Sequence, residues 1–195
     1  IIFTGEQKII ANAGGGMLNT SVSLVRKGLD VALISELGDD KTAMEILKFL
    51  DENQVKYVTM IHSKAYTAQE IAAACHIPGR IFAKTVILKI DGKFSMAVLP
   101  ATHRVNLDLF RQISHSKNVE LASEEEFEGL FPKSEIGAMP PFGNLYDLPT
   151  YVDNSLTQDE DICFNATTHS EVIKMRYDEF EKLVKPVIGT FSENL

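Results

Sequence analysis

Residues 83–99 read AKTVILKIDGKFSMAVL, and this stretch decides the fold. Two apolar runs rich in β-strand formers flank Asp91-Gly92, a dipeptide that favours the positive φ angles of a tight hairpin turn. The stretch therefore predicts an antiparallel hairpin with strands over 83–90 and 93–99. An antiparallel hairpin of this length needs further strands or helices to cover its apolar faces.

Shorter elements are predicted outward from the hairpin. Strands are expected over 57–61, 150–152, 161–164 and 171–175, and helices over 42–53, 71–75, 106–113 and 178–184. The capping-box sequences Thr67-Ala-Gln-Glu70 and Ser123-Glu-Glu-Glu126 mark two helix starts. Because the strands after residue 60 are short and interspersed with helices, we expect an α+β fold with a mixed, barrel-like sheet and surrounding helices.

The first forty residues follow a different pattern. A glycine-rich turn and a helix are predicted over 14–28, then a short apolar strand over 31–35 and a turn at Gly38-Asp-Asp40. This order predicts a short α/β segment before the α+β part.

Composition sets the class of protein. The chain has 195 residues, 45% hydrophobic and 24% charged, as expected for one globular domain with a short appendage. No apolar run approaches the roughly 18 residues of a membrane span, and the N-terminus lacks signal-peptide features, so we expect a cytoplasmic location and no membrane. Its two cysteines, Cys75 and Cys163, are predicted to be buried free thiols rather than a disulfide or metal ligands.

Charge is unevenly distributed along the sequence. The net charge of -8 argues against a broad nucleic-acid surface. Residues 80–117, however, contain seven Lys or Arg against two Asp, whereas residues 118–161 are acidic. The basic segment predicts either a small nucleic-acid footprint or solvated faces with no partner.

Three features carry chemistry, and each has two interpretations. Lys84 shares a strand face with Val86, Leu88 and Ile90, so it is either a functional lysine or an end-of-strand lysine whose ammonium reaches water. The loop Gly137-Ala-Met-Pro-Pro-Phe-Gly143 is either a rigid connection or a backbone cradle for a carbonyl or oxyanion. His169 is either structural or catalytic.

Four segments, in order, resemble the YbaK/prolyl-tRNA-synthetase-associated editing domain. They are Tyr66-Thr-Ala-Gln-Glu-Ile, Ala83-Lys-Thr-Val-Ile-Leu-Lys, the Gly137–Gly143 loop, and Phe164-Asn-Ala-Thr-Thr-His-Ser-Glu-Val-Ile-Lys-Met. The resemblance covers about residues 44–186 and leaves 187–195 as a C-terminal tail. It implies a hydrolase that frees wrong amino acids from tRNA and uses no metal or cofactor.

The resemblance also implies roles for single residues. Lys84, Gly137 and His169 would be catalytic. Substrate-binding roles fall on the following residues: Thr67, Ala138, Met139, Pro140, Pro141, Phe142 and Gly143. Ala166-Thr167-Thr168 departs from the Ala-Gly-Ser expected before the histidine. The implied partners are the acceptor end of mischarged tRNA and an aminoacyl-tRNA synthetase. We expect the chain to act as a monomer.

The N-terminal segment is similar to the start of pfkB-type sugar kinases. The similarity lies in Ala13-Gly-Gly-Gly-Met-Leu-Asn19 and in the residues through Asp40, and it implies that Asn19 contacts a sugar. The family's catalytic Gly-Ala-Gly-Asp segment has no match, so we do not expect a kinase. The join between residues 1–43 and the editing domain falls within 43–56. Two alternatives to the hydrolase stay open: a non-catalytic tRNA- or synthetase-binding module, and a sugar-binding remnant.

Overall fold

The computed structural model describes residues 2–4, 8–10, 43–62 and 64–195. Its helices are α2 (Ala43–Glu52), α3 (Ala68–Ala74), α4 (Leu107–Ser114), α5 (Glu124–Phe127) and α6 (Tyr177–Val184), with 3₁₀ turns η1 (Glu128–Leu130), η2 (Gly143–Tyr146) and η3 (Asn154–Gln158). Its strands are β1 (Ile2–Thr4), β2 (Lys8–Ile10), β3 (Tyr57–Ile61), β4 (Ala83–Ile90), β5 (Lys93–Pro100), β6 (His103–Val105), β7 (Val119–Leu121), β8 (Thr150–Asp153), β9 (Asp161–Asn165), β10 (Glu171–Arg176), β11 (Val187–Gly189) and β12 (Ser192–Asn194). The elements predicted between residues 14 and 40 lie outside the described residues. None of the described helices is long and apolar enough to cross a bilayer.

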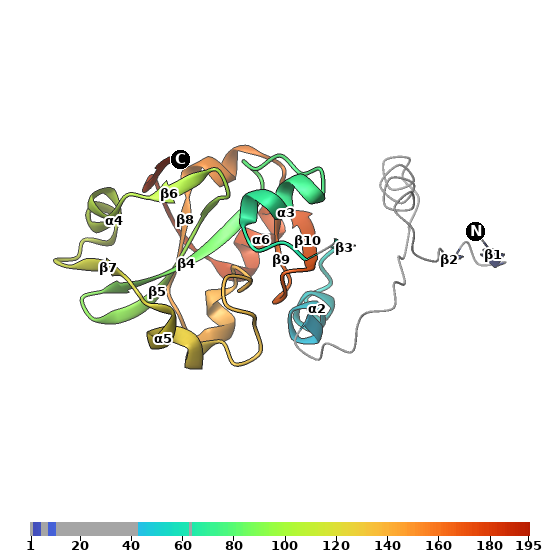
Figure 1. Ribbon diagram of the computed structural model, residues 1–195, viewed down its shortest axis with the longest axis horizontal. Helices are drawn as coiled ribbons and strands as arrows, with labels where there is room; N and C mark the ends of the chain where they lie inside the picture. Colours follow the sequence, from blue (N-terminus) through green and yellow to red (C-terminus); the bar gives the residue numbers. More distant parts are fainter. Residues whose placement is uncertain (1, 5–7, 11–42, 63) are drawn as a thin grey trace.

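The predicted central hairpin is confirmed. Strands β4 and β5 pair antiparallel from Ala83 with Pro100 to Ile90 with Lys93. Asp91 and Gly92 have φ angles of 47° and 82°, the left-handed pair that a type I′ turn requires. The hairpin crosses the middle of the molecule, with α4 at one end and α2 and α3 at the other (Figure 1).

The strands form open sheets. The larger sheet has the order β11-β8-β5-β4-β7, in which β8 is parallel to both of its neighbours, and a second sheet has the order β3-β10-β9. The two meet at an isolated bridge between Phe82 and Cys163. The α+β class is confirmed, but the barrel-like sheet is not, because neither sheet closes within the described part of the chain. Three-residue edge strands, β7 and β11, leave too few hydrogen bonds for closure.

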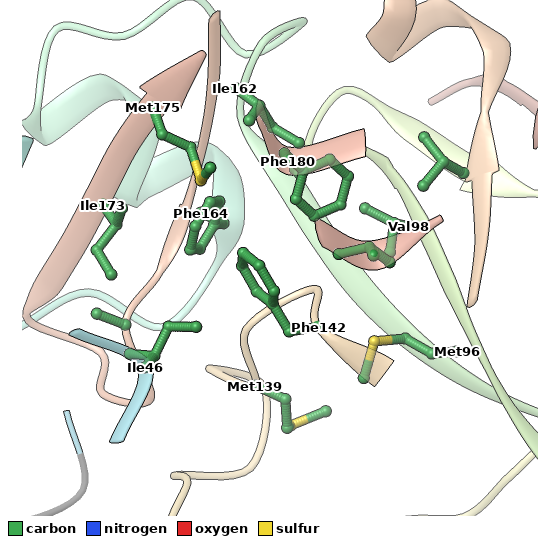
Figure 2. Close-up of a cluster of buried hydrophobic side chains, with 14 of the residues drawn as sticks. Ile46, Met96, Val98, Met139, Phe142, Ile162, Phe164, Ile173, Met175 and Phe180 are labelled. Carbon is green, nitrogen blue, oxygen red and sulfur yellow. The ribbon is translucent and has the colours of Figure 1, made fainter. Parts of the chain in front are cut away.

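The core joins the two sheets. Phe142 packs edge-on against Phe164 and Phe180, each with a ring-centroid distance of 5.4 Å, and Met139 lies beside it (Figure 2). Ile46 and Leu50 bring the apolar face of α2 into the same cluster. The loop that contains Met139 and Phe142 is therefore anchored in the core.

The residues expected to form a tail, 187–195, are part of the sheet structure. Strand β11 pairs with β8, and β12 pairs with β6. Between them Phe191 is fully buried, with its ring centroid 4.9 Å from that of Phe110. Each of these strands has three residues, too few for an alternation to show in the sequence.

Asp153 anchors the C-terminal segment, residues 187–195, by hydrogen bonds. Its carboxylate accepts hydrogen bonds from the backbone N–H groups of Phe191 and Ser192, both at 2.9 Å, and from the Ser155 hydroxyl at 2.6 Å. Burial raises the pKa of Asp153, but the hydrogen bonds from Ser155, Phe191 and Ser192 outweigh it and hold the pKa below its usual value. The ionised form therefore stabilises the fold.

We expect Asp153→Ala to lower the free energy of unfolding by about 2–3 kcal/mol at neutral pH, because it leaves buried N–H donors without an acceptor. Since the folded pKa lies below the unfolded value of about 3.9, this contribution is complete above that value and is lost as pH falls below it. Urea unfolding of both chains from pH 7 to pH 3 tests this. If the difference in free energy of unfolding between the two chains stayed constant from pH 7 to pH 3, the stabilising role of the ionised Asp153 would be contradicted.

Candidate functional site

Lys84 is a half-buried cation on β4. Its Nζ donates a long hydrogen bond of 3.5 Å to the Ala101 carbonyl, and Gln69 Nε2 donates to the same oxygen at 3.4 Å. Burial lowers the pKa of Lys84. No carboxylate in the described part of the chain pairs with its ammonium. A desolvated cation without an anionic partner is costly in a fold, and it is available to an anionic ligand.

The apolar face predicted around Lys84 is confirmed. Val86, Leu88 and Ile90 pack in one apolar cluster, and Phe82, on the same face of the chain, packs in another beneath α3. Lys84 therefore lies between two apolar clusters.

Gly137 and His169 are in contact. Gly137 has a φ of 86°, and a Cβ placed there would lie 3.3 Å from His169 Cε1. His169 Nε2 is 2.9 Å from the Ile136 carbonyl. Because a carbonyl only accepts, Nε2 carries the hydrogen, and in the neutral ring Nδ1 is the acceptor. Nδ1 is buried and has no partner among the described residues.

Three residues that the sequence did not single out as functional hold this contact. Glu135 accepts a hydrogen bond from the His169 backbone N–H at 2.7 Å and one from Lys64 Nζ at 3.2 Å. Burial raises the pKa of Glu135, but these two hydrogen bonds outweigh it and lower the pKa. The exposed Tyr66 ring lies 5.3 Å from the His169 ring. No sequence pattern marks Glu135 or Lys64, although Tyr66 begins a segment quoted above.

The Gly137–Gly143 loop is bonded to itself and packed inward. The Gly137 N–H donates to Met139 Sδ at 3.2 Å, and the Ala138 N–H donates to the Glu135 carbonyl at 2.9 Å. All six residues after Gly137 are buried: Ala138, Met139, Pro140, Pro141, Phe142 and Gly143. Their direct contact with substrate stays a prediction.

Gly143 and Thr67 have structural roles. A Cβ on Gly143 would lie 2.3 Å from Thr150 Oγ1 and 2.7 Å from the Leu148 carbonyl, so close packing requires a glycine there. The Thr67 hydroxyl accepts the Glu70 N–H at 3.2 Å within the predicted capping box. A further role of either residue in binding stays a prediction.

Thr167, where the family resemblance leads us to expect glycine, has a φ of 75°. This left-handed conformation is unfavourable for a β-branched residue and costs glycine nothing. We expect Thr167→Gly to be more stable than Thr167→Ala by about 1 kcal/mol, since both variants lose the same buried side-chain atoms beyond Cβ and only alanine keeps the strain. Urea unfolding measures the difference. If Thr167→Ala were the more stable variant, as alanine usually is at a negative φ, the left-handed conformation of Thr167 would be contradicted.

The basic segment is largely neutralised in space. Arg80 pairs with Asp159, Arg104 with Glu193 and Arg111 with Asp108. Lys89 pairs with Glu120 and Glu126. Only Lys84, Lys93 and Lys117 of the predicted seven lack a carboxylate partner among the described residues. The ion pairs therefore argue against a broad basic surface, and the small nucleic-acid footprint stays a prediction.

A cavity of about 170 Å³ lies beside the loop. Its apolar lining comes from Phe127, Phe131, Pro132, Ile136 and Met139, and its polar lining from Glu128 and Ser134. Ile136 and Met139 flank Gly137, so the cavity adjoins the loop that contacts His169.

The structure brings Gly137 and His169 together, whereas the side-chain hydrogen bond described for Lys84 goes to Ala101; that Lys84, Gly137 and His169 share one site stays a prediction. The chain's residues 62–183 match the family model described as the aminoacyl-tRNA editing domain. The match spans more than half of the chain, and the chain belongs to this family.

Curated relatives are proline–tRNA ligases. The chain is 28% identical over 162 residues to the enzyme of Staphylococcus saprophyticus, covering 78% of this chain and 28% of the relative. It is 27% identical over 150 residues to that of Staphylococcus aureus strain Newman, covering 72% and 26%. The chain thus spans about a quarter of the length of these relatives.

Solved structures share the fold. One described as a candidate trans-editing enzyme for prolyl tRNA synthetase has a TM-score of 0.69 at 19% identity, covering 80% of this chain and all of that one. A hypothetical protein has a TM-score of 0.70 at 18% identity, covering 76% and 99%. The family match begins at residue 62, so the sugar-kinase resemblance of the first residues stays a prediction.

Proposed function

We propose that this domain hydrolyses the ester bond between a wrong amino acid and tRNA. The observation that carries the proposal is the family match over 62–183, which includes Lys84, the Gly137–Pro141 segment and His169. Gly137 and His169 are in contact, and Lys84 has no carboxylate partner among the described residues. A site that retains these three features is better explained by turnover than by binding alone.

The chemistry requires few groups. An aminoacyl ester is already activated, so hydrolysis needs a positioned water and stabilisation of the charge that develops on the carbonyl oxygen. We assign Lys84 to the terminal phosphate or ribose, as a point charge. We assign the Gly137 N–H to the oxyanion, because its present acceptor, a thioether sulfur, is weak and is readily replaced by an anionic oxygen.

His169 positions the loop in this proposal. Its Nε2–H donates a hydrogen bond to the carbonyl of Ile136, one residue before Gly137. Its backbone N–H donates a hydrogen bond to the Glu135 carboxylate. Its Nδ1 is buried and has no partner among the described residues, so the ring's one described hydrogen bond is the one that holds the loop. His169 therefore contributes mainly by fixing where the Gly137 N–H lies.

The substrate is inferred from the relatives and the cavity. Proline–tRNA ligases as relatives favour tRNA^Pro carrying a wrong amino acid, and a cavity of about 170 Å³ beside the loop suits a small side chain. We further propose that the chain acts as a monomer in the cytoplasm and cooperates with a synthetase. A panel of mischarged tRNAs in a deacylation assay tests the function. Binding of tRNA without release of any amino acid would favour the non-catalytic module.

The domain boundary also has a test. Deleting residues 1–42 should leave a folded, active hydrolase, since the family match and all the proposed site residues lie after them. Circular dichroism and the deacylation rate compare the two chains. Insoluble or inactive protein after this deletion would show that the N-terminal segment shares the domain's core. Hexose binding, measured by calorimetry, tests the sugar-binding alternative, and we expect none.

A further inference from the structure

Strand pairing is incomplete along the edge of β4 beside Lys84. On one side β4 pairs with β5 along its whole length. On the other side β7 pairs only with residues 88–90, and β9 meets the chain only at the bridge between Phe82 and Cys163. In the described part of the chain, residues 83–86 of β4 therefore have no strand partner on that side.

The register of the bridge places Asn165 of β9 level with Lys84 of β4. The Phe82–Cys163 bridge is parallel, so two residues further along each strand Lys84 and Asn165 lie at the same level and on the same face. The core packing agrees with this register. Phe82 and Cys163 share one apolar cluster, whereas Ala83 and Phe164, the next residue on each strand, share the other.

Asn165 has an unused acceptor. The residue is only 7% exposed, and its Oδ1 is buried with no hydrogen-bond partner among the described residues. Val172, its cross-strand neighbour on β10, is apolar and offers no side-chain donor. Buried polar atoms in folded proteins are nearly always paired, so an unpaired one beside an unpaired strand segment points to an absent ligand.

We propose that Asn165 binds the free ribose hydroxyl of the terminal nucleotide of tRNA, beside Lys84. This inference rests on the proposed function. An aminoacyl ester occupies one hydroxyl of the terminal ribose and leaves the neighbouring one free to donate to Asn165 Oδ1. The substrate's ammonium group would also donate, but it would then lie close to the Lys84 ammonium, and like charges repel in a half-buried site. Asn165 thus becomes a binding residue that orients the ester.

Two uncleavable analogues test this contact directly. In both, an amide replaces the ester at the 3′ position of adenosine, and the amino acid is the one that the deacylation panel turns over fastest. One analogue keeps the 2′-hydroxyl and the other is 2′-deoxy. We would measure the affinity of each for the wild-type chain, for Asn165→Leu, which has a similar volume and no acceptor, and for Asn165→Ser, whose shorter side chain is a safer replacement for folding.

The expected result is specific to the hydroxyl. Both Asn165 variants should weaken binding of the hydroxyl analogue about tenfold and change binding of the deoxy analogue less than twofold. Asn118→Leu, at an exposed position outside the proposed site, should change neither. Equal weakening for both analogues, or none for either, would overturn the role of Asn165 while leaving the proposed function standing. A wild-type chain that binds neither analogue and deacylates no tRNA would overturn both.

Discussion

Lys84→Ala should lose about a hundredfold or more of the single-turnover deacylation rate and keep its fold. In the proposed mechanism the Lys84 ammonium binds the substrate's terminal phosphate or ribose, and losing one such electrostatic contact typically costs this much. The fold should survive because Lys84 makes one long hydrogen bond to Ala101 and no ion pair among the described residues. Removing a desolvated charge should leave the free energy of unfolding unchanged or slightly higher.

Lys93→Ala is the matched control. Lys93 lies on β5 of the same hairpin, is exposed, and also lacks a carboxylate partner among the described residues. It carries the same charge without the burial, so its replacement should leave the rate within twofold. If the wild type and Lys84→Ala had equal deacylation rates and the variant had a normal circular dichroism spectrum, Lys84 would be an end-of-strand lysine with no role in catalysis.

Gly137→Ala should also lose about a hundredfold or more in rate, through a different cause. An alanine Cβ would lie 3.3 Å from His169 Cε1, so the ring or the loop must shift and the Gly137 N–H loses its position. The φ of 86° adds backbone strain of about 1–2 kcal/mol for any residue with a Cβ. The expected signature is a rate loss far larger than the loss of stability can explain.

Gly92→Ala separates the two effects. Gly92 has a similar φ of 82°, but a Cβ there would meet nothing within 4 Å. Gly92→Ala should therefore lower the free energy of unfolding by the same amount of backbone strain, measured with urea, and leave the deacylation rate unchanged. If both variants lose rate in proportion to stability, Gly137 serves the turn alone and the oxyanion assignment is wrong.

Local signals allowed much of the fold to be predicted. The β4–β5 hairpin follows from Asp91-Gly92, and the start of α3 from a capping box that closes within four residues. Strands β6, β7, β11 and β12 could not be predicted, because three residues show no alternation and their pairing depends on partners far along the chain. The barrel-like sheet was wrong because strand composition does not specify where pairing stops.

The site was predictable in its residues and not in its contacts. Lys84 stood out because its strand neighbours are apolar, and the structure confirms that environment. The hydrogen bond from the His169 backbone N–H to the Glu135 carboxylate joins residues 34 apart in the sequence, and no local pattern predicts it. Asn165 was missed for a similar reason, since its significance comes from the bridge that sets β9 against β4. The departure at Thr167 was visible in the sequence, but its φ of 75° was not.

The most direct test of the account is the single-turnover rate of amino-acid release from mischarged and correctly charged tRNA, each with and without the wild-type chain. We predict that at least one mischarged tRNA is deacylated about a hundredfold or more faster than it hydrolyses spontaneously, while correctly charged tRNA^Pro is spared. No acceleration for any mischarged tRNA, by a chain that is folded and binds the acceptor end, would contradict the proposal that this domain is a hydrolase.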